Sequence, residues 1–292
     1  MSTTPSAGGP AAPGRDGRVP PLLRALIDDA AVFPPGNAPL PQALTDHSAH
    51  RAAWYADLVG PLLLPLRTAR TLGADGPPRL GIICDTGPDG VPAALAAAEP
   101  TWRQLEVAVA ARGEDPRPGL RTLLAAAAGR SDMDFYAEVP FGDRVPDALD
   151  LIADARAGGT RVAPKFRTGG ARADLFPTPG QLAEVICGCR DRDLPFKLTA
   201  GLHHAVRHTD PATGFTHHGF VNVLAACLAA EGGATVAEVT DLLSRTDPRP
   251  LVDTVAAGLE RDRPLWIAFG SCSIPEPLAD LTALGLLSEG GS

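Results

Sequence analysis

The sequence predicts one α/β domain with a (β/α)8 TIM-barrel fold, and three observations support that prediction. Eight short apolar runs recur along the chain, and segments with helical periodicity alternate with them. The length of 292 residues suits a barrel of roughly 250 residues with extensions. An open, doubly wound sheet is the alternative, but no Gly-x-Gly-x-x-Gly pattern follows the first apolar run to support it.

The predicted strands are short runs bounded by turn-forming residues, and the predicted helices between them are rich in Ala and Leu. The segment after the second strand is short and poorly helical, so it is the weakest of the eight units. Strands are expected at 26–33, 61–66, 79–85, 104–109, 134–140, 161–167, 195–201 and 265–271, and helices at 41–57, 91–99, 117–129, 146–157 and 178–191.

The connection between the last two strands, residues 202–264, is longer than one crossover helix requires and has room for three helices. An insertion that follows a barrel strand lies at the carboxyl-terminal mouth, where barrel enzymes have their active sites. We therefore expect this enlarged crossover to form a lid or one wall of the pocket.

The amino-terminal segment differs in composition from the rest of the chain. Residues 1–20 are rich in Pro, Gly and Ser and lack the apolar core of a signal peptide, so they predict a disordered tail. Residues 21–292 are then the single barrel domain.

The totals limit the partners and the compartment. Five scattered cysteines, an odd number, indicate a reducing cytoplasm rather than a disulfide framework. A formal charge of −8 argues against nucleic acid, and no apolar run approaches the roughly 20 residues of a membrane span. We expect a cytoplasmic protein that acts on a small molecule, and the sequence leaves open whether it forms a homo-oligomer.

Lysine is rare in this chain. Lys165 and Lys197 are the only lysines among 26 basic residues, and the other 24 are arginines. Arginine stays protonated, whereas a buried lysine can lose its proton and act as a nucleophile or base. The two lysines are therefore the first candidates for catalysis.

Alternation along the predicted strands indicates which side chains face the barrel interior. In 161–167, the apolar residues Val162, Pro164 and Phe166 face the helices, so Lys165 and Arg167 face inward. Of two consecutive aspartates in the first strand, at most one can face inward. The same rule assigns these polar residues to the interior: Asp28 (if Asp29 faces outward), Glu106, Tyr136, Glu138, Lys197 and Thr199.

Neighbouring lysines lower each other's pKa, so we expect one of the two to be partly neutral near pH 7. That is the requirement for a lysine that forms a Schiff base. The alternative is a buried ion-pair network, Glu138 with Lys165 and Glu106 with Arg167, that stabilises the barrel without chemistry.

Two stretches resemble class I, Schiff-base aldolases of the deoxyribose-phosphate aldolase type. These are "KFRTGG" (165–170) and "FKLTAGL" (196–202), which together span about forty residues of chain. The resemblance implies that Lys165 forms the imine and that Lys197 lowers its pKa, with Glu106 as the nearest candidate for the family's strand-4 acid.

The whole chain more closely resembles a set of uncharacterised bacterial TIM-barrel proteins. The shared stretches are LIDxAxxFPP (26–35), the KFRTGG turn and FKxTAGLHH (196–204). This second resemblance implies no particular activity.

Histidines are concentrated after the seventh predicted strand, where five of the seven in the chain fall within 203–218. Histidine can act as an acid or base near neutrality or bind a metal, and His204 and His208 have the i,i+4 spacing that helps on a helix. A divalent zinc, iron or manganese ion is one interpretation, and a polar lid of solvated histidines is the other. The candidate metal ligands are His203, His204, His208, His217 and His218. His47 and His50 are expected on the outer surface of the first helix.

The last strand ends in "FGSCSIPEPLADL", where Ser273 and Glu276 fit a capping box that starts the final helix. In barrels this region can also bind phosphate, for which Ser271 and Ser273 are candidates. The donors of an arginine side chain form a planar fork that suits a carboxylate or a phosphate group. Arg167 and Arg207 are therefore further candidates for binding an anionic substrate.

The leading hypothesis is an aldolase-like lyase that forms a Schiff base with a small, anionic carbonyl substrate and needs no cofactor. Its predicted catalytic residues are Lys165, Lys197, Glu138, Glu106, His203 and His204, and its predicted substrate contacts are Arg167, Thr199, Arg207, Ser271, Ser273 and Asp28. The second hypothesis is a metal-dependent lyase, isomerase or hydrolase that uses the histidines. The third is a non-catalytic ligand-binding barrel.

Overall fold

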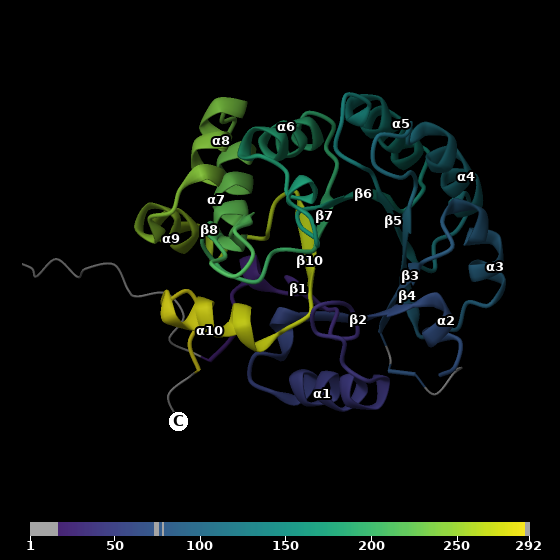
Figure 1. The fold of residues 1–292 in the computed structure, drawn as a ribbon, viewed down its shortest axis with the longest axis horizontal. Helices are drawn as coiled ribbons and strands as arrows, with labels where there is room; N and C mark the ends of the chain where they lie inside the picture. The colour runs from purple at the N-terminus through teal and green to yellow at the C-terminus, as the bar shows by residue number, and fades with distance from the viewer. Residues whose placement is uncertain (1–16, 73–75, 78, 290–292) are drawn as a thin grey trace, which may run out of the picture.

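Eight parallel strands close into a barrel in the computed structural model, which describes residues 17–72, 76–77 and 79–289 (Figure 1). Their order around the barrel is β1-β10-β7-β6-β5-β4-β3-β2. This confirms the predicted (β/α)8 fold. The strands are β1 (Ile27–Asp29), β2 (Val59–Pro65), β3 (Leu80–Cys84), β4 (Trp102–Ala108), β5 (Asp134–Glu138), β6 (Val162–Arg167), β7 (Phe196–Thr199) and β10 (Trp266–Ser271).

Helices surround the barrel, and apolar residues of these helices contribute to one hydrophobic core with the strands (Figure 1). In α4, for example, the buried residues Leu120, Leu123 and Ala127 follow the three- and four-residue spacing of one helix face. The second unit has only a four-residue helix, which agrees with its weak periodicity. The helices of the first six units are α1 (Leu40–Ala52), α2 (Leu66–Ala69), α3 (Val91–Ala96), α4 (Arg117–Ala127), α5 (Val145–Ala157) and α6 (Pro179–Arg190).

The long crossover after β7 begins with a short hairpin, β8 (His208–Thr209) with β9 (Thr216–His217), and continues with three helices. These helices are α7 (Phe220–Glu231), α8 (Val236–Ser244) and α9 (Pro248–Gly258). Helix α8 packs on α6 and α7, and α9 packs on α7, so all three extend the outer layer (Figure 1). Nearly every residue of α7 is buried among its neighbours, so this helix belongs to the packed outer layer, and the expectation that the crossover forms a lid or one wall of the pocket stays a prediction for the loop before it.

The amino-terminal segment is buried in the hydrophobic core just before the first strand. Val19 is buried, and so are Leu22 and Leu23 of the short 3-10 helix η1 (Pro21–Leu23). Residues 17–20 of the predicted tail thus belong to the folded domain, and residues 1–16 lie outside the described residues. The last helix, α10 (Pro275–Ala283), follows β10.

Across the described ranges, we find no helix with the length and hydrophobicity needed to span a membrane.

Candidate active site

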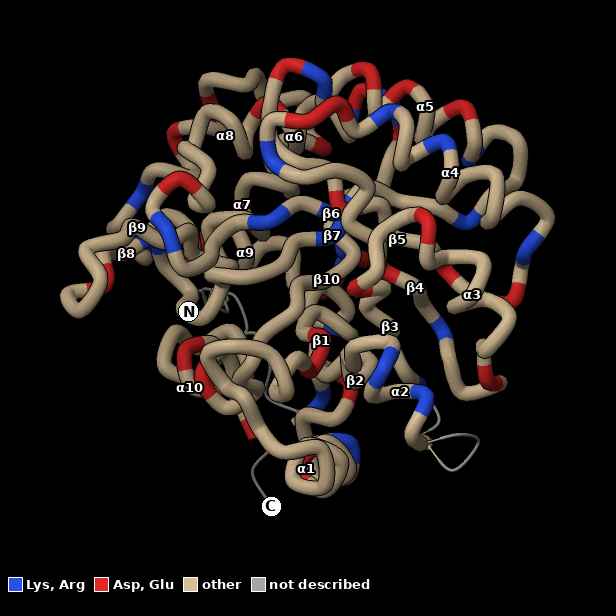
Figure 2. Tube along the Cα trace, turned by 45° about the vertical axis from the view of Figure 1, so that its right-hand side comes forward, with Lys and Arg blue, Asp and Glu red and all other residues tan. Residues whose placement is uncertain are grey.

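Two lysines and three carboxylates lie together inside the barrel. Lys165 and Lys197 are aligned on the adjacent strands β6 and β7, and Glu138 is aligned with Lys165 on β5. They face inward because the residues that alternate with them, such as Phe166 and Leu198, are fully buried against the helices. Figure 2 shows basic and acidic segments on these central strands, apart from the many charges at the periphery. Asp28, Glu106, Glu138, Lys165 and Lys197 are called the charge cluster below.

The charge cluster is a continuous chain of ion pairs across the barrel. The Glu106 carboxylate bridges the two amines, with Oε2 2.7 Å from Lys165 Nζ and Oε1 2.5 Å from Lys197 Nζ. Lys165 Nζ also lies 2.8 Å from Glu138 Oε2, and Lys197 Nζ donates to Asp28. Each amine therefore lies between two carboxylates, and Glu106 is common to both.

The charge cluster holds both lysines protonated. Burial opposes the charge on Lys165, but Glu106 and Glu138 outweigh that effect and raise its pKa above the ordinary value. Burial also opposes the charge on Lys197, and Asp28 and Glu106 raise its pKa. The expectation of a partly neutral lysine is therefore wrong, because it counted the two amines without the carboxylates beside them.

The three carboxylates respond differently to this environment. Burial alone would raise the pKa of Glu106, but the two lysines lower it to about 2. The pKa of Glu138 is also lowered, because Lys165 and Arg167 outweigh its burial. Burial dominates at Asp28 and raises its pKa despite the neighbouring Lys197. Glu106 is thus the most firmly ionised acid of the charge cluster.

Glu138 and Arg167 connect the charge cluster to the carboxyl-terminal mouth. Arg167, at the end of β6, is 46% exposed at its side chain, and its Nε donates to Glu138 Oε1 at 3.1 Å. The side chain of Glu138 is 17% exposed, whereas that of Lys165 below it is 4% exposed. The predicted pair of Glu106 with Arg167 is not found among the described residues. Glu106 pairs with Lys165 and Lys197 instead, and Arg167 pairs with Glu138.

Two glycine turns fix the ends of the lysine strands. Thr168 Oγ1 donates to the Ala200 carbonyl, and a Cβ at Gly201 would lie 2.9 Å from the Thr168 carbonyl oxygen. A Cβ at Gly169 would lie 2.8 Å from Gly201 Cα. The turns after β6 and β7 therefore touch backbone to backbone, which only glycine permits here. Thr199, the last residue of β7, is half-buried beside them.

The predicted metal ligands do not converge. His203 pairs with Glu276 of α10 (Nδ1–Oε2 3.2 Å), and His204 pairs with Asp280 of the same helix (Nδ1–Oδ2 3.3 Å). The part of the chain that the structure describes contains no group of three His, Cys, Asp or Glu side chains arranged to hold a metal ion. Nor does any contact there join His203 or His204 to the charge cluster. His204 packs edge-on against His208, with 4.8 Å between ring centroids, but the acids paired with His203 and His204 come from α10.

The remaining histidines of this loop form packing contacts. His208 stacks on His217 with 5.2 Å between ring centroids, and His217 packs edge-on against Phe176. His218 is fully buried and lies 2.8 Å from the Pro177 carbonyl oxygen, and burial lowers its pKa to about 4.

Other predicted contacts have local structural partners. Ser271 Oγ donates to the Ser273 carbonyl, and Ser273 Oγ accepts the backbone N–H of Glu276. The reciprocal half of the predicted capping box is replaced by the pair of Glu276 with His203. Arg207 is half-buried with Nη1 3.4 Å from His218 Nδ1, and burial lowers its pKa.

His47 was predicted on an outer surface but is buried, with Nδ1 2.9 Å from Asp29 Oδ2. This pair joins α1 to β1 and accounts for the aspartate that points away from the barrel interior. His50 is half-buried against the Tyr55 hydroxyl. The sequence did contain a signal for this pair. Asp28 and Asp29 are consecutive in a strand, so one of them must point toward the helices and needs a polar partner there.

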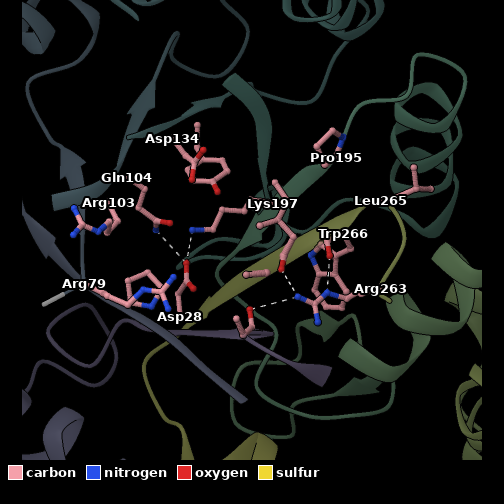
Figure 3. Close-up of a pocket in the computed structure, with 15 residues that line it drawn as sticks. Asp28, Arg79, Arg103, Gln104, Asp134, Pro195, Lys197, Arg263, Leu265 and Trp266 are labelled. Carbon is pink, nitrogen blue, oxygen red and sulfur yellow. Dashed lines mark hydrogen bonds and ion pairs between the residues drawn. The ribbon is translucent and has the colours of Figure 1, made fainter. Parts of the chain in front are cut away.

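Gln104 and Tyr136 were not among the predicted site residues. The Gln104 amide donates to Asp28 at 3.2 Å and to Glu106 at 3.0 Å, and Figure 3 shows Asp28 between Gln104 and Lys197. Lys197 Nζ lies 4.5 Å from the centre of the Tyr136 ring. Strand alternation contained the signal, since Gln104 and Tyr136 lie two residues before Glu106 and Glu138.

Comparison of the chain with protein-family models and with curated proteins finds no match.

Proposed function

We propose that this barrel is an enzyme in which Lys165 forms an imine with a small carbonyl substrate, in a lyase reaction of the class I aldolase type. The observation that supports this most strongly is the position of the Lys165 amine. It lies between Glu106 and Glu138, directly below the mouth, and shares Glu106 with a second lysine. A purely structural ion pair requires neither the second amine nor an opening beside Glu138.

Lys165 gains a nucleophilic amine in this proposal by moving its proton to Glu138. Loss of that proton to water would leave an uncompensated negative charge in the barrel, which is costly at low dielectric. Transfer to Glu138 at 2.8 Å leaves the net charge of the cluster unchanged. Glu138 suits this role better than Glu106, whose pKa two lysines lower to about 2.

The covalent steps balance with these groups. The neutral Lys165 amine adds to the carbonyl carbon, which gives an alkoxide on oxygen and a protonated nitrogen. Protonated Glu138 donates its proton to the alkoxide and then takes one back from the nitrogen, so that a neutral carbinolamine and a protonated Glu138 result. Protonation of the hydroxyl by Glu138 then releases water and leaves a cationic imine between two carboxylates. That cation occupies the electrostatic position of the original ammonium.

Arg167 favours an anionic substrate in this scheme. It is paired with Glu138 at 3.1 Å, and protonation of Glu138 would free its guanidinium for a carboxylate or phosphate group at the mouth. Thr199, aligned with Arg167 on the adjacent strand, offers a hydroxyl in the same region.

Exchange of α-protons tests the proposal without knowledge of the natural substrate. An imine acidifies the C–H next to the former carbonyl, so the enzyme should exchange deuterium from D2O into accepted aldehydes, ketones or 2-oxo acids, measured by proton NMR. Lys165→Arg should abolish this exchange, because arginine keeps the ion pairs but forms no imine. Arg121→Ala, on the exposed surface of α4, is the control.

Exchange that survives in Lys165→Arg would overturn the proposal. Saturable carbonyl binding without exchange in the unsubstituted protein would favour a non-catalytic binding barrel. The metal-dependent alternative has less support, since the histidines pair with different neighbours.

A further inference from the structure

A polar pocket opens at the end of the barrel opposite the mouth. Its volume is about 370 Å³, and its lining residues come from the beginnings of the strands and the turns before them. Arg103 and Asp134 open β4 and β5, and Leu265 precedes β10 (Figure 3). Glu138, Arg167 and Thr199 end their strands, so this amino-end pocket is separate from the mouth used above.

The lining of the amino-end pocket is predominantly basic. Four basic residues and two acidic residues line it, and the basic ones are Arg79, Arg103, Lys197 and Arg263. Both acids are already compensated. Asp28 accepts from Lys197, and Asp134 pairs with Arg161 at 2.7 Å.

Arg79 and Arg103 supply the uncompensated charge. Neither pairs with a carboxylate among the described residues, and Arg103 uses Nη1 on the Pro100 and Trp102 carbonyls. Nε and Nη2 of Arg103 remain for a ligand. Arg263 is different, because its donors are engaged by backbone carbonyls.

A tyrosine hydroxyl also lacks a hydrogen-bond partner in this pocket. Tyr136 is only 5% exposed and lines the pocket, and its hydroxyl has no hydrogen-bond partner in the described part of the chain. Burial raises its pKa, so the hydroxyl is a donor at neutral pH. The hydroxyl is therefore free to donate to an acceptor from outside the chain.

We propose that the amino-end pocket binds a small organic anion, with its carboxylate or phosphate held by Arg103 and Arg79 and an acceptor oxygen at the Tyr136 hydroxyl. Apolar residues such as Pro61 and Ile267 complete the wall and suit a short carbon skeleton. A volume of about 370 Å³ lies within the range of small-molecule sites. The amino-terminal face of a barrel commonly serves stability, and an open basic pocket with a free tyrosine donor does not serve that purpose.

Direct binding tests this site independently of any imine chemistry. Inorganic phosphate and malonate are titrated into the full-length protein by isothermal calorimetry at low ionic strength. We expect saturable binding of at least one probe. Arg103→Ala and Tyr136→Phe should each weaken it about tenfold or more, as loss of a charge-assisted or buried hydrogen bond implies.

Two further variants locate the bound anion. Arg121→Ala removes an exposed arginine remote from both ends and should leave the affinity unchanged. Arg167→Ala removes the exposed arginine of the mouth and should also leave it unchanged. Circular dichroism confirms that each variant is folded.

Three results would overturn the proposal. These are no saturable binding of either probe, equal binding by Arg103→Ala and Arg121→Ala, or binding that only Arg167→Ala removes. The last result would assign the anion to the mouth, where it belongs to the proposed imine site. Failure of the exchange assay above would leave this test unaffected, since neither probe forms an imine.

Discussion

At the scale of single residues, Glu106 is the carboxylate on which the charge cluster depends. It is 1% exposed and pairs with both lysines. We expect Glu106→Gln to destabilise the protein by about 3–5 kcal/mol, because it leaves buried ammonium charge without compensation. Urea unfolding measures this loss. Glu260→Gln, at an exposed position, should change stability by less than about 0.5 kcal/mol, and equal stability of the two variants would contradict the electrostatic account.

The pH dependence of stability follows from the same carboxylate. An acid whose pKa is lower in the folded than in the unfolded chain stabilises the fold above its unfolded pKa and loses that contribution as the pH falls toward the folded pKa. For Glu106 the window runs from 4.5 down to about 2. At about 1.4 kcal/mol per pH unit, the loss is about 3 kcal/mol.

Comparison of Glu106→Gln with the unsubstituted protein at each pH isolates this contribution, since Asp28, whose pKa is raised, acts with the opposite sign. The stability difference between the two proteins should shrink as the pH falls through the window. A difference that stays constant from about pH 6 to pH 2 would show that Glu106 does not titrate as described.

At the scale of elements, the two glycine turns after β6 and β7 position the lysine strands. Gly201 has φ +77° and a close carbonyl neighbour, whereas Gly214 has φ +70° and open space around its Cα. Gly214→Ala should cost about 1 kcal/mol from backbone strain alone. Gly201→Ala should cost roughly 3 kcal/mol, since a steric clash adds to the strain. Thermal unfolding compares the two, and equal costs would mean that the contact between the turns contributes little.

The strands were predictable because apolar runs and turn residues mark them locally. The first was predicted at 26–33 but pairs only over Ile27–Asp29, because the chain turns at Ala30 and then enters the prolines 34 and 35. The alternation of residues along each strand was enough to predict which charged side chains face inward. It could not predict which of them form ion pairs. Asp28 contacts Lys197 across the intervening strand β10, and such a contact depends on how the barrel closes and on the strand register.

The histidine loop could not be interpreted from the sequence alone. Five histidines close in sequence suggested one site, but two of them find partners on α10, more than 70 residues away. Local density predicts proximity only when the segment is regular, and this one contains a hairpin. The functional interpretation of a cluster therefore depends on its distant partners.

At the scale of the whole molecule, Arg263 ties the amino-terminal segment to β10. Its guanidinium donates to the carbonyls of Leu22, Trp266 and Ile267, and burial lowers its pKa to about 10. Arg263→Lys should destabilise the barrel by about 3 kcal/mol, because one amine cannot reach carbonyls in several directions. Guanidinium unfolding measures this. Arg261→Lys, whose exposed side chain pairs with Glu231, is the control and should have little effect.

The molecule as a whole places a charge-compensated pair of amines between its two ends. Lys165 lies toward the mouth beside Glu138, and Lys197 lies toward the amino-end pocket beside Asp28. Covalent chemistry is assigned to Lys165 because it is the lysine that lies on the side of the mouth. This placement also predicts that substitution of Lys197 leaves the site of attachment on Lys165.

Borohydride trapping tests that central claim most directly. The protein is mixed with pooled small aldehydes, ketones and 2-oxo acids, reduced, and analysed by intact and peptide mass spectrometry. We expect one reduced adduct per chain on Lys165, absent in Lys165→Arg and still formed in Lys197→Arg. An adduct on Lys197 instead, or none on Lys165 with any carbonyl compound of the pool, would contradict the proposed function.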